Sequence, residues 1–336
     1  MELKVFISLG LLAIGALLSL HLSNSQANSS HSQFASFKQK FGKIYSSPEE
    51  EAYRLSIFSA RLLRIDDHNS KNLSWRKGIN QFSDMTFEEF ESFFLLKETP
   101  SKSDLENTRD VNLPKAKKDW REEKVVTPVR EQRTCKASWA FSAIGAMESA
   151  WAIKNKDKAP LTFSVQELID CSKGHFDNDG CKGGRLDNSY DYIRSQQINL
   201  DSDYPFTGVD GTCEAKTDVF YVRTGITSYT RLPRYDVEEL VKMIDRQPVP
   251  VAFQVMADFL EYKSGIYKPE LSYCGQALNA ALLVVGYNTL VDKEAHFILK
   301  NSWGTGWGEE GFVRVIVGGG SGTCGIANMH DVVPNL

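Results

Sequence analysis

The sequence has no cysteine before Cys135, no Cys-x-x-Cys pair and no cluster of basic residues. The missing Cys-x-x-Cys spacing argues against a structural zinc site. A formal net charge of -4 leaves no electrostatic footprint for nucleic acid or for an anionic membrane surface. What remains is an ordinary globular composition, 42% hydrophobic and 24% charged over 336 residues, which can bury one large core or two smaller ones.

The chain opens with a segment of the secretory type. Residues 5–22 are almost wholly apolar, follow Lys4 and precede Ser25, Gln26 and Ala27, a small-x-small pattern typical of signal-peptidase cleavage. We predict a signal peptide over residues 1–27, entry into the secretory pathway, and an extracellular or lysosome-like destination without membrane contact. A retained anchor is the alternative, because the run is about long enough to span a bilayer. Its polar residues and the missing positive flank after it weigh against that alternative.

The even number of cysteines fits this route. Six cysteines in a secreted chain indicate disulfides rather than a metal site. Spacing alone leaves 15 possible pairings of six cysteines open.

The hydrophobic patterns divide the chain into helical and β-rich parts. Leu55, Phe58, Leu62 and Ile65 recur at heptad spacing and predict an amphipathic helix in a polar region over residues 34–94. Short β-branched and aromatic runs over residues 251–255, 281–287, 297–300 and 312–316 predict strands. A largely helical first half is therefore followed by a β-rich second half.

Ser138 lies where a polar turn carrying Cys135 runs into an apolar helix containing Trp139, Phe141 and Ile144. The positive end of the helix dipole then falls on Ser138. A serine hydroxyl becomes a good nucleophile only when a neighbouring base removes its proton. The presence or absence of such a base therefore decides what Ser138 can do.

Several motifs around these features resemble those of papain-like cysteine proteases. Cys135, Ala137 and Trp139 match the family's segment Cys, Gly, Ser or Ala, Cys, Trp, in which the second cysteine is the nucleophile. A Gly-Cys-x-Gly-Gly turn over residues 180–184 and an Asn-Ser-Trp-Gly run from residue 301 are also similar to the family's. Two earlier motifs resemble the propeptide of the cathepsin L-like group, with Arg61 where an asparagine is usual. The matching positions are Glu50, Arg54, Ile57, Phe58, Ile65, Asn69, Gly78, Asn80, Phe82 and Asp84.

The resemblance implies an α+β, papain-like two-lobed fold, with a helical left lobe and a β-barrel-like right lobe, preceded by a helical propeptide. We expect an inhibitory-type prosegment over residues 28–112, with a cleavage point near Asn112, and a papain-like domain over residues 113–336. In the family, such a prosegment lies through the substrate cleft of its own domain, so we expect it to be a partner of the rest of the chain. No cofactor and no metal are implied.

The resemblance also implies a disulfide pairing. By position, Cys135 pairs with Cys181, Cys171 with Cys213, and Cys274 with Cys324. Each closed loop would stabilise the fold by roughly 2 to 4 kcal/mol. An active member of the family would need a seventh, unpaired cysteine, and the sequence has none.

The family's catalytic positions fall here on Gln132, Ser138, Ala280 and Asn301. The oxyanion donor Gln132 and the imidazole-orienting Asn301 are intact, but serine replaces the catalytic cysteine and alanine replaces the catalytic histidine. His296 is the histidine nearest in sequence to Asn301, yet strand alternation would point it away. The substrate-binding positions implied by the resemblance are Gly183, Gly184, Leu186, Ala252 and Trp303.

Arg133 and Lys136 are two further departures, because the family has glycine at both positions. They would crowd the oxyanion region, or require other backbone angles if those glycines use positive φ. Relaxed demand for catalysis explains them without any new function. A cleft that takes an anionic ligand is the sharper alternative.

We therefore expect a papain-like pseudoprotease that binds a peptide or protein in a retained cleft. One alternative is residual endopeptidase or serine hydrolase activity through Ser138, and another is a structural or storage protein.

Overall fold

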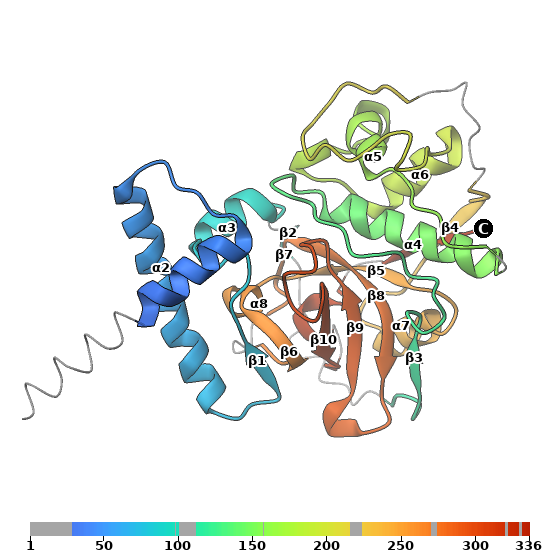
Figure 1. The fold of residues 1–336 in the computed structure, drawn as a ribbon. Helices are drawn as coiled ribbons and strands as arrows, with labels where there is room; N and C mark the ends of the chain where they lie inside the picture. Colours follow the sequence, from blue (N-terminus) through green and yellow to red (C-terminus); the bar gives the residue numbers. More distant parts are fainter. Residues whose placement is uncertain are drawn as a thin grey trace, which may run out of the picture.

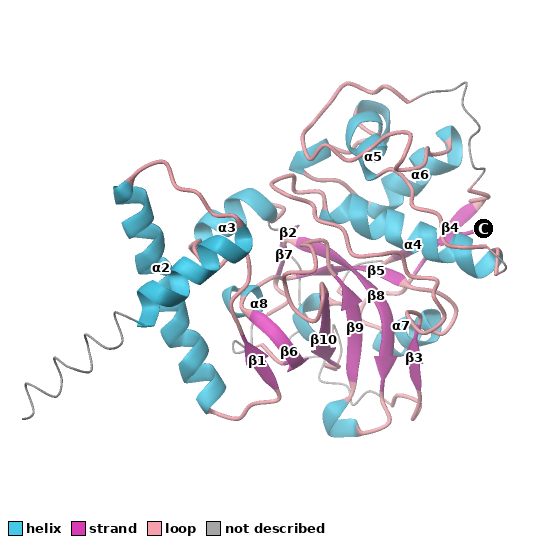
Figure 2. Ribbon diagram, in the orientation of Figure 1, coloured by secondary structure: helices cyan, strands magenta, loops and turns pink. Residues whose placement is uncertain are grey.

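The computed structural model describes residues 29–97, 99–100, 112–156, 158–215, 224–269, 274–319, 322–328 and 331–336. The predicted signal peptide and most of the linker before Asn112 lie outside these ranges. The described residues form a helical N-terminal unit, a helical lobe and a β lobe, which Figures 1 and 2 show side by side. None of the helices described is long and apolar enough to cross a membrane.

The prosegment begins with helical residues 29–41 and continues through four named elements. These elements are α2 (Pro48–Ser70), β1 (Trp75–Lys77), α3 (Phe87–Phe94) and β2 (Thr99–Pro100). Ser47 caps α2 by accepting a hydrogen bond from the amide of Glu50, and the predicted apolar face of α2 buries Phe58 and Ile65. The Phe58 ring lies 5.3 Å from that of Phe34, so the two prosegment helices share a small aromatic core.

The helical lobe is arranged around α4 (Ser138–Lys154), with α5 (Val165–Cys171) and α6 (Leu186–Gln196) packed beside it. Short 3₁₀ turns cover Gly174–Phe176 and Gly180–Lys182. Every residue of α4 from Ser138 to Ala152 is buried, because this helix is enclosed between its own lobe and the sheet of the β lobe.

The β lobe contains a seven-stranded sheet of order β1-β6-β10-β9-β8-β3, with β5 also paired to β8. Its strands after β1 are β3 (Lys117–Asp119), β5 (Val249–Phe253), β6 (Tyr262–Tyr267), β8 (Ala280–Asn288), β9 (His296–Lys300) and β10 (Phe312–Ile316). The remaining elements are β4 (Ser228–Arg231) with its partner β11 (Val332–Asn335), β7 (Ala277–Leu278), α7 (Val237–Ile244), α8 (Ala257–Leu260), and 3₁₀ turns at Asp292–Glu294 and Thr323–Gly325. The four predicted strands are present, with ends shifted by up to two residues.

The prosegment contributes β1 to this sheet and β2 to a separate two-stranded sheet. β1 pairs antiparallel with β6, and β2 pairs antiparallel with β7. Phe82 and Phe90 place their rings 6.0 Å and 5.0 Å from that of Trp303. The predicted partnership of the prosegment with the rest of the chain is therefore present in the fold.

Three disulfides cross-link residues within the lobes. They join Cys135 to Cys181, Cys171 to Cys213 and Cys274 to Cys324, which is the pairing implied by the resemblance. No cysteine is left free.

Candidate active site

Ser138 is the first residue of α4, at the helix end predicted from the sequence. Its side chain is buried, and its Oγ accepts a hydrogen bond of 3.2 Å from the backbone N–H of Ala281. Among the residues that the structure describes, no group accepts a hydrogen bond from this hydroxyl. Ser138 is thus held by the first residues of β8 without a base beside it.

Ala280 opens β8 and is buried, and Ala281, the next residue, contacts Ser138. Asn301 follows β9 directly, and its Oδ1 accepts from the backbone N–H of Ser302 at 2.8 Å. The Nδ2 of Asn301 is buried and has no hydrogen-bond partner. An unpaired buried amide costs about 1–3 kcal/mol, so this part of the site lacks a group that would complete it.

Gln132 is fully buried and held from two sides. Its Oε1 accepts from the Ser302 hydroxyl at 2.7 Å, and its Nε2 donates to the Cys135 carbonyl at 3.0 Å. The same Nε2 donates to the backbone carbonyl of Phe94, also at 3.0 Å. The side-chain amide of Gln132, predicted from the sequence as the oxyanion donor, is therefore bonded to the prosegment.

The prosegment passes between the two lobes at this point. The backbone N–H of Leu96 donates to the carbonyl of Asn279 at 2.8 Å. A Cβ added to Gly183 on the helical lobe would lie 3.4 Å from Leu96 Cδ2. We call this line of contact, from Gln132 and Gly183 across to Asn279, the cleft.

Sequence reasoning did not find Phe94, Leu96 or Asn279 as cleft residues. Their contacts are backbone bonds between segments far apart in the chain. The two propeptide-like motifs, the second over residues 78–84, indicated a prosegment upstream of them but not these contacts.

No described histidine can serve Ser138. His296 lies opposite Asn288 at the far end of β8, about 26 Å along the strand from Ala280. Its Nδ1 lies 2.6 Å from the Glu294 carbonyl oxygen, and burial lowers its pKa. His175 is exposed and packs against Phe176, while His31 and His68 belong to the prosegment and His330 is outside the described residues.

The predicted substrate-binding positions fall into two groups. Gly183 and Trp303 contact the prosegment, as described above. A Cβ on Gly184, in contrast, would lie only 2.5 Å from the Trp139 ring, so this glycine is explained by packing. Leu186 begins α6 and packs on the helical core, and Ala252 pairs with Ala281 in the sheet; both are half-buried.

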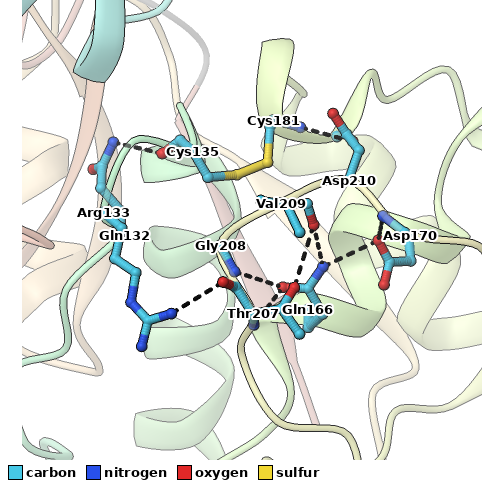
Figure 3. The surroundings of a disulfide bond; sticks show 12 residues. Gln132, Arg133, Cys135, Gln166, Asp170, Cys181, Thr207, Gly208, Val209 and Asp210 are labelled. Atoms are coloured by element: carbon cyan, nitrogen blue, oxygen red, sulfur yellow. Dashed lines mark hydrogen bonds between the residues drawn. A yellow bond between two sulfur atoms is a disulfide. The ribbon is translucent and has the colours of Figure 1, made fainter.

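Arg133 takes the left-handed backbone, with φ of 51°. Figure 3 shows its guanidinium group reaching the carbonyl of Thr207, to which it donates at 3.0 Å, and it also lies over the Phe206 ring. Its charge is therefore fixed on the turn that carries Gly208. Lys136 does not have positive φ, so a side chain there requires no strained backbone.

The comparisons with known proteins agree with this architecture. The profile of papain family cysteine proteases matches residues 113–333, and that of the cathepsin propeptide inhibitor domain (I29) matches residues 34–90. A cathepsin L-like proteinase of Fasciola hepatica is 35% identical over 88% of this chain and 91% of its own length. The thiol protease aleurain of Arabidopsis thaliana is also 35% identical, over 88% of this chain and 81% of its own.

Two solved structures are similar over nearly their whole length. The digestive procathepsin L 3 of the Tenebrio molitor larval midgut has a TM-score of 0.79 at 33% identity, covering 91% of this chain and 99% of that one. A recombinant stem bromelain precursor has a TM-score of 0.79 at 34% identity, covering 92% and 99%. Sequence profile, relatives and fold thus agree: the chain belongs to the papain family of cysteine proteases, in the cathepsin L-like group that carries an inhibitory propeptide domain.

Proposed function

We propose that this protein is a non-catalytic member of the papain family that binds extended peptide or protein segments in its cleft. The observation that carries the proposal is the environment of Ser138. Its hydroxyl accepts from the backbone N–H of Ala281, and the neighbouring Ala280 is the residue that the resemblance aligns with the family's base.

The chemistry of the family needs a thiolate and an imidazolium. A thiol has a pKa of about 8.5, and a serine hydroxyl is far less acidic. Assistance of about 0.3–1 kcal/mol from the end of α4 does not close that gap. Loss of the base from such a catalytic unit costs orders of magnitude in rate, and all six cysteines are tied up in disulfides.

Retained binding groups support the other half of the proposal. Gln132, Gly183 and the carbonyl of Asn279 all contact the prosegment, and the β7 edge accepts an added strand. Strand addition draws its affinity from backbone hydrogen bonds, so it does not depend on the lost side chains. A peptide of suitable sequence could therefore take the place of prosegment residues 94–97.

Residual hydrolysis through Ser138 is the second candidate. The relatives named above are described as a proteinase and a thiol protease, and Gln132 donates to the carbonyl of Cys135, three residues before Ser138. This candidate needs a proton acceptor for the Ser138 hydroxyl, which the described residues do not offer.

We also propose the boundaries of the segments of the chain and the location of the protein. We place a signal peptide over residues 1–27, the prosegment over 28–112, the papain-like domain over 113–336, and the protein outside the cell or in a lysosome-like compartment. Three disulfides and the two matched family regions support this arrangement.

The test compares the full chain with the same chain cut in the linker after Pro100 by an added protease that is then inactivated. We expect no labelling by a thiol-reactive epoxide, no turnover of a fluorogenic dipeptide above that of Ser138→Ala, and binding of a fluorescent neutral peptide to the cut form. Turnover that disappears in Ser138→Ala would establish the hydrolase instead. Failure of every peptide to bind the cut form would refute the binding role.

A further inference from the structure

We propose that Lys136 and Lys182 form a subsite beside Ser138 that takes an acidic side chain of the ligand, aspartate or glutamate. The inference rests on the proposed function and names the chemistry of its ligand.

The disulfide between Cys135 and Cys181 places the two lysines together. The Cα atoms of the two cysteines lie 4.6 Å apart, and each lysine is the next residue after one of them. The backbone N–H of Lys136 donates to the Cys181 carbonyl at 3.1 Å, which fixes the two segments side by side. Ser138 follows Lys136 by two residues, and Gly183, which meets the prosegment, follows Lys182 directly. The backbones of Lys136 and Lys182 thus lie on the helical-lobe side of the cleft, in the segments that lead to Ser138 and Gly183.

Neither lysine has a described hydrogen bond or ion pair through its ammonium group, whereas the neighbouring charges are paired. Asp210, which Figure 3 shows beside Cys181, pairs with Lys173 at 2.9 Å and accepts from the backbone N–H of Cys181. Arg133 is held by the Thr207 carbonyl.

Arg185, which follows Gly184 in the sequence, shares the carboxylate of Asp187 with Arg231, at 2.9 Å and 2.8 Å. Asp177 lies in the field of Arg185. Asp179, exposed on the turn before Cys181, has no described ion pair, so within this turn the two lysines outnumber the free carboxylate.

The prosegment, which lies in the cleft, does not carry a negative charge opposite the two lysines in its described residues. Leu96 seats its side chain against Gly183, and the next residue of the prosegment is the exposed Lys97. The charge of Lys97 would be repelled by the two lysines, whereas an acidic residue in its place would be attracted to them. This attraction weakens as salt is added. A ligand with an acidic residue at this point would therefore compete well with the prosegment.

The first experiment uses the prosegment of the intact chain as a tethered ligand. Lys97→Glu and Lys97→Gln are made in the wild-type background and in the double variant Lys136→Gln, Lys182→Gln. At low salt we expect Lys97→Glu to raise Tm by about 1–3 °C more than Lys97→Gln. This difference should vanish in the double-variant background and at high salt, and should persist in the control background Lys117→Gln, which removes a remote exposed lysine. An equal response to glutamate and glutamine in the wild-type background would overturn the proposal.

The second experiment measures peptide binding to the form cut in the linker. One peptide is made with glutamate, glutamine or lysine at the residue that follows the one seated at Gly183. We expect the glutamate peptide to bind about 3- to 10-fold more tightly than the glutamine peptide, and the lysine peptide least tightly. If all three bind equally, this proposal fails and the peptide-binding function stands. If none binds, both fail.

Discussion

Glu261 is predicted to be the residue on which attachment of the prosegment most depends. It follows α8, it is buried, and its carboxylate accepts contacts from three prosegment cations. Arg61 lies at 3.3 Å, Lys77 at 3.3 Å and Arg64 at 3.1 Å. Arg61 and Lys77 are as buried as the acid, with side chains 4% and 6% exposed, whereas Arg64 is 53% exposed. The Glu261 carboxylate therefore faces two buried positive charges.

Replacing Glu261 by glutamine keeps the shape and removes the charge. Breaking a buried ion pair from one side costs about 3–5 kcal/mol, because the remaining partner stays charged in a poor solvent. Burial already lowers the pKa of Arg61, which shows how strongly this guanidinium group is desolvated. We expect a loss of about 3–5 kcal/mol in the free energy that holds the prosegment to the papain-like domain. The contact with the exposed Arg64 adds little to this figure.

The assay is urea unfolding of the full chain, combined with hydrogen exchange of the amides that join β1 to β6. Glu261→Gln should open these amides at lower urea than the helical lobe. The matched control is Glu239→Gln, whose partner Lys242 is 66% exposed, and we expect it to change stability by less than about 0.5 kcal/mol. If Glu261→Gln also stays within about 0.5 kcal/mol of wild type, the reasoning from buried charge is wrong.

Three further predictions concern the site and the core. The double variant Ser138→Cys, Ala280→His restores both reacting groups, and we expect its linker-cut form to turn over a fluorogenic dipeptide. Neither single variant should do so. A double variant that is well folded but inactive would count against the assignment of these positions. Gly184→Ala should destabilise the chain by about 1–3 kcal/mol in urea, because its Cβ would meet the Trp139 ring at 2.5 Å; a neutral result would mean that the ring moves freely. Burial raises the pKa of Asp331 well above its ordinary value. The folded state then holds a proton that the unfolded state has released, so stability falls as pH rises above about 4, and Asp331→Asn should stabilise the chain at pH 7 but not near pH 4. Thermal unfolding over this range measures the effect, and a stabilisation independent of pH would contradict it.

Local patterns predicted the elements well because they depend on neighbours in the sequence. The heptad positions Phe58 and Ile65 lie on the buried face of α2, and Ser138 begins α4. The β-branched and aromatic runs correspond to β5, β8, β9 and β10. The family resemblance added the order of the two lobes and the cysteine pairing, neither of which spacing could have selected.

Contacts between distant segments could not be predicted in the same way. Glu261 forms ion pairs with residues about 200 positions earlier in the chain, and the sequence around it does not indicate these partners. Phe94 meets Gln132 through a backbone carbonyl, which carries no side-chain signature. Gly184 remains predicted as a substrate-binding position, and its close approach to the Trp139 ring was not predicted, because a glycine pair in the sequence does not show which group approaches it.

On the proposed function, in which Ser138 and Ala280 replace the reacting groups, the fold persists because other atoms hold it together. The contacts that join the lobes near Ser138 run through Gln132, Ser302 and backbone groups. Removing a thiol and an imidazole takes nothing from these bonds, and the unpaired Nδ2 of Asn301 is the cost that remains visible. The prosegment is held by a second set, the ion cluster at Glu261 and the rings around Trp303, which also does not involve the lost groups. Access to the cleft therefore depends on how strongly the prosegment is attached, and a ligand can enter the cleft only if it competes with residues 94–97 or binds after the prosegment has been released.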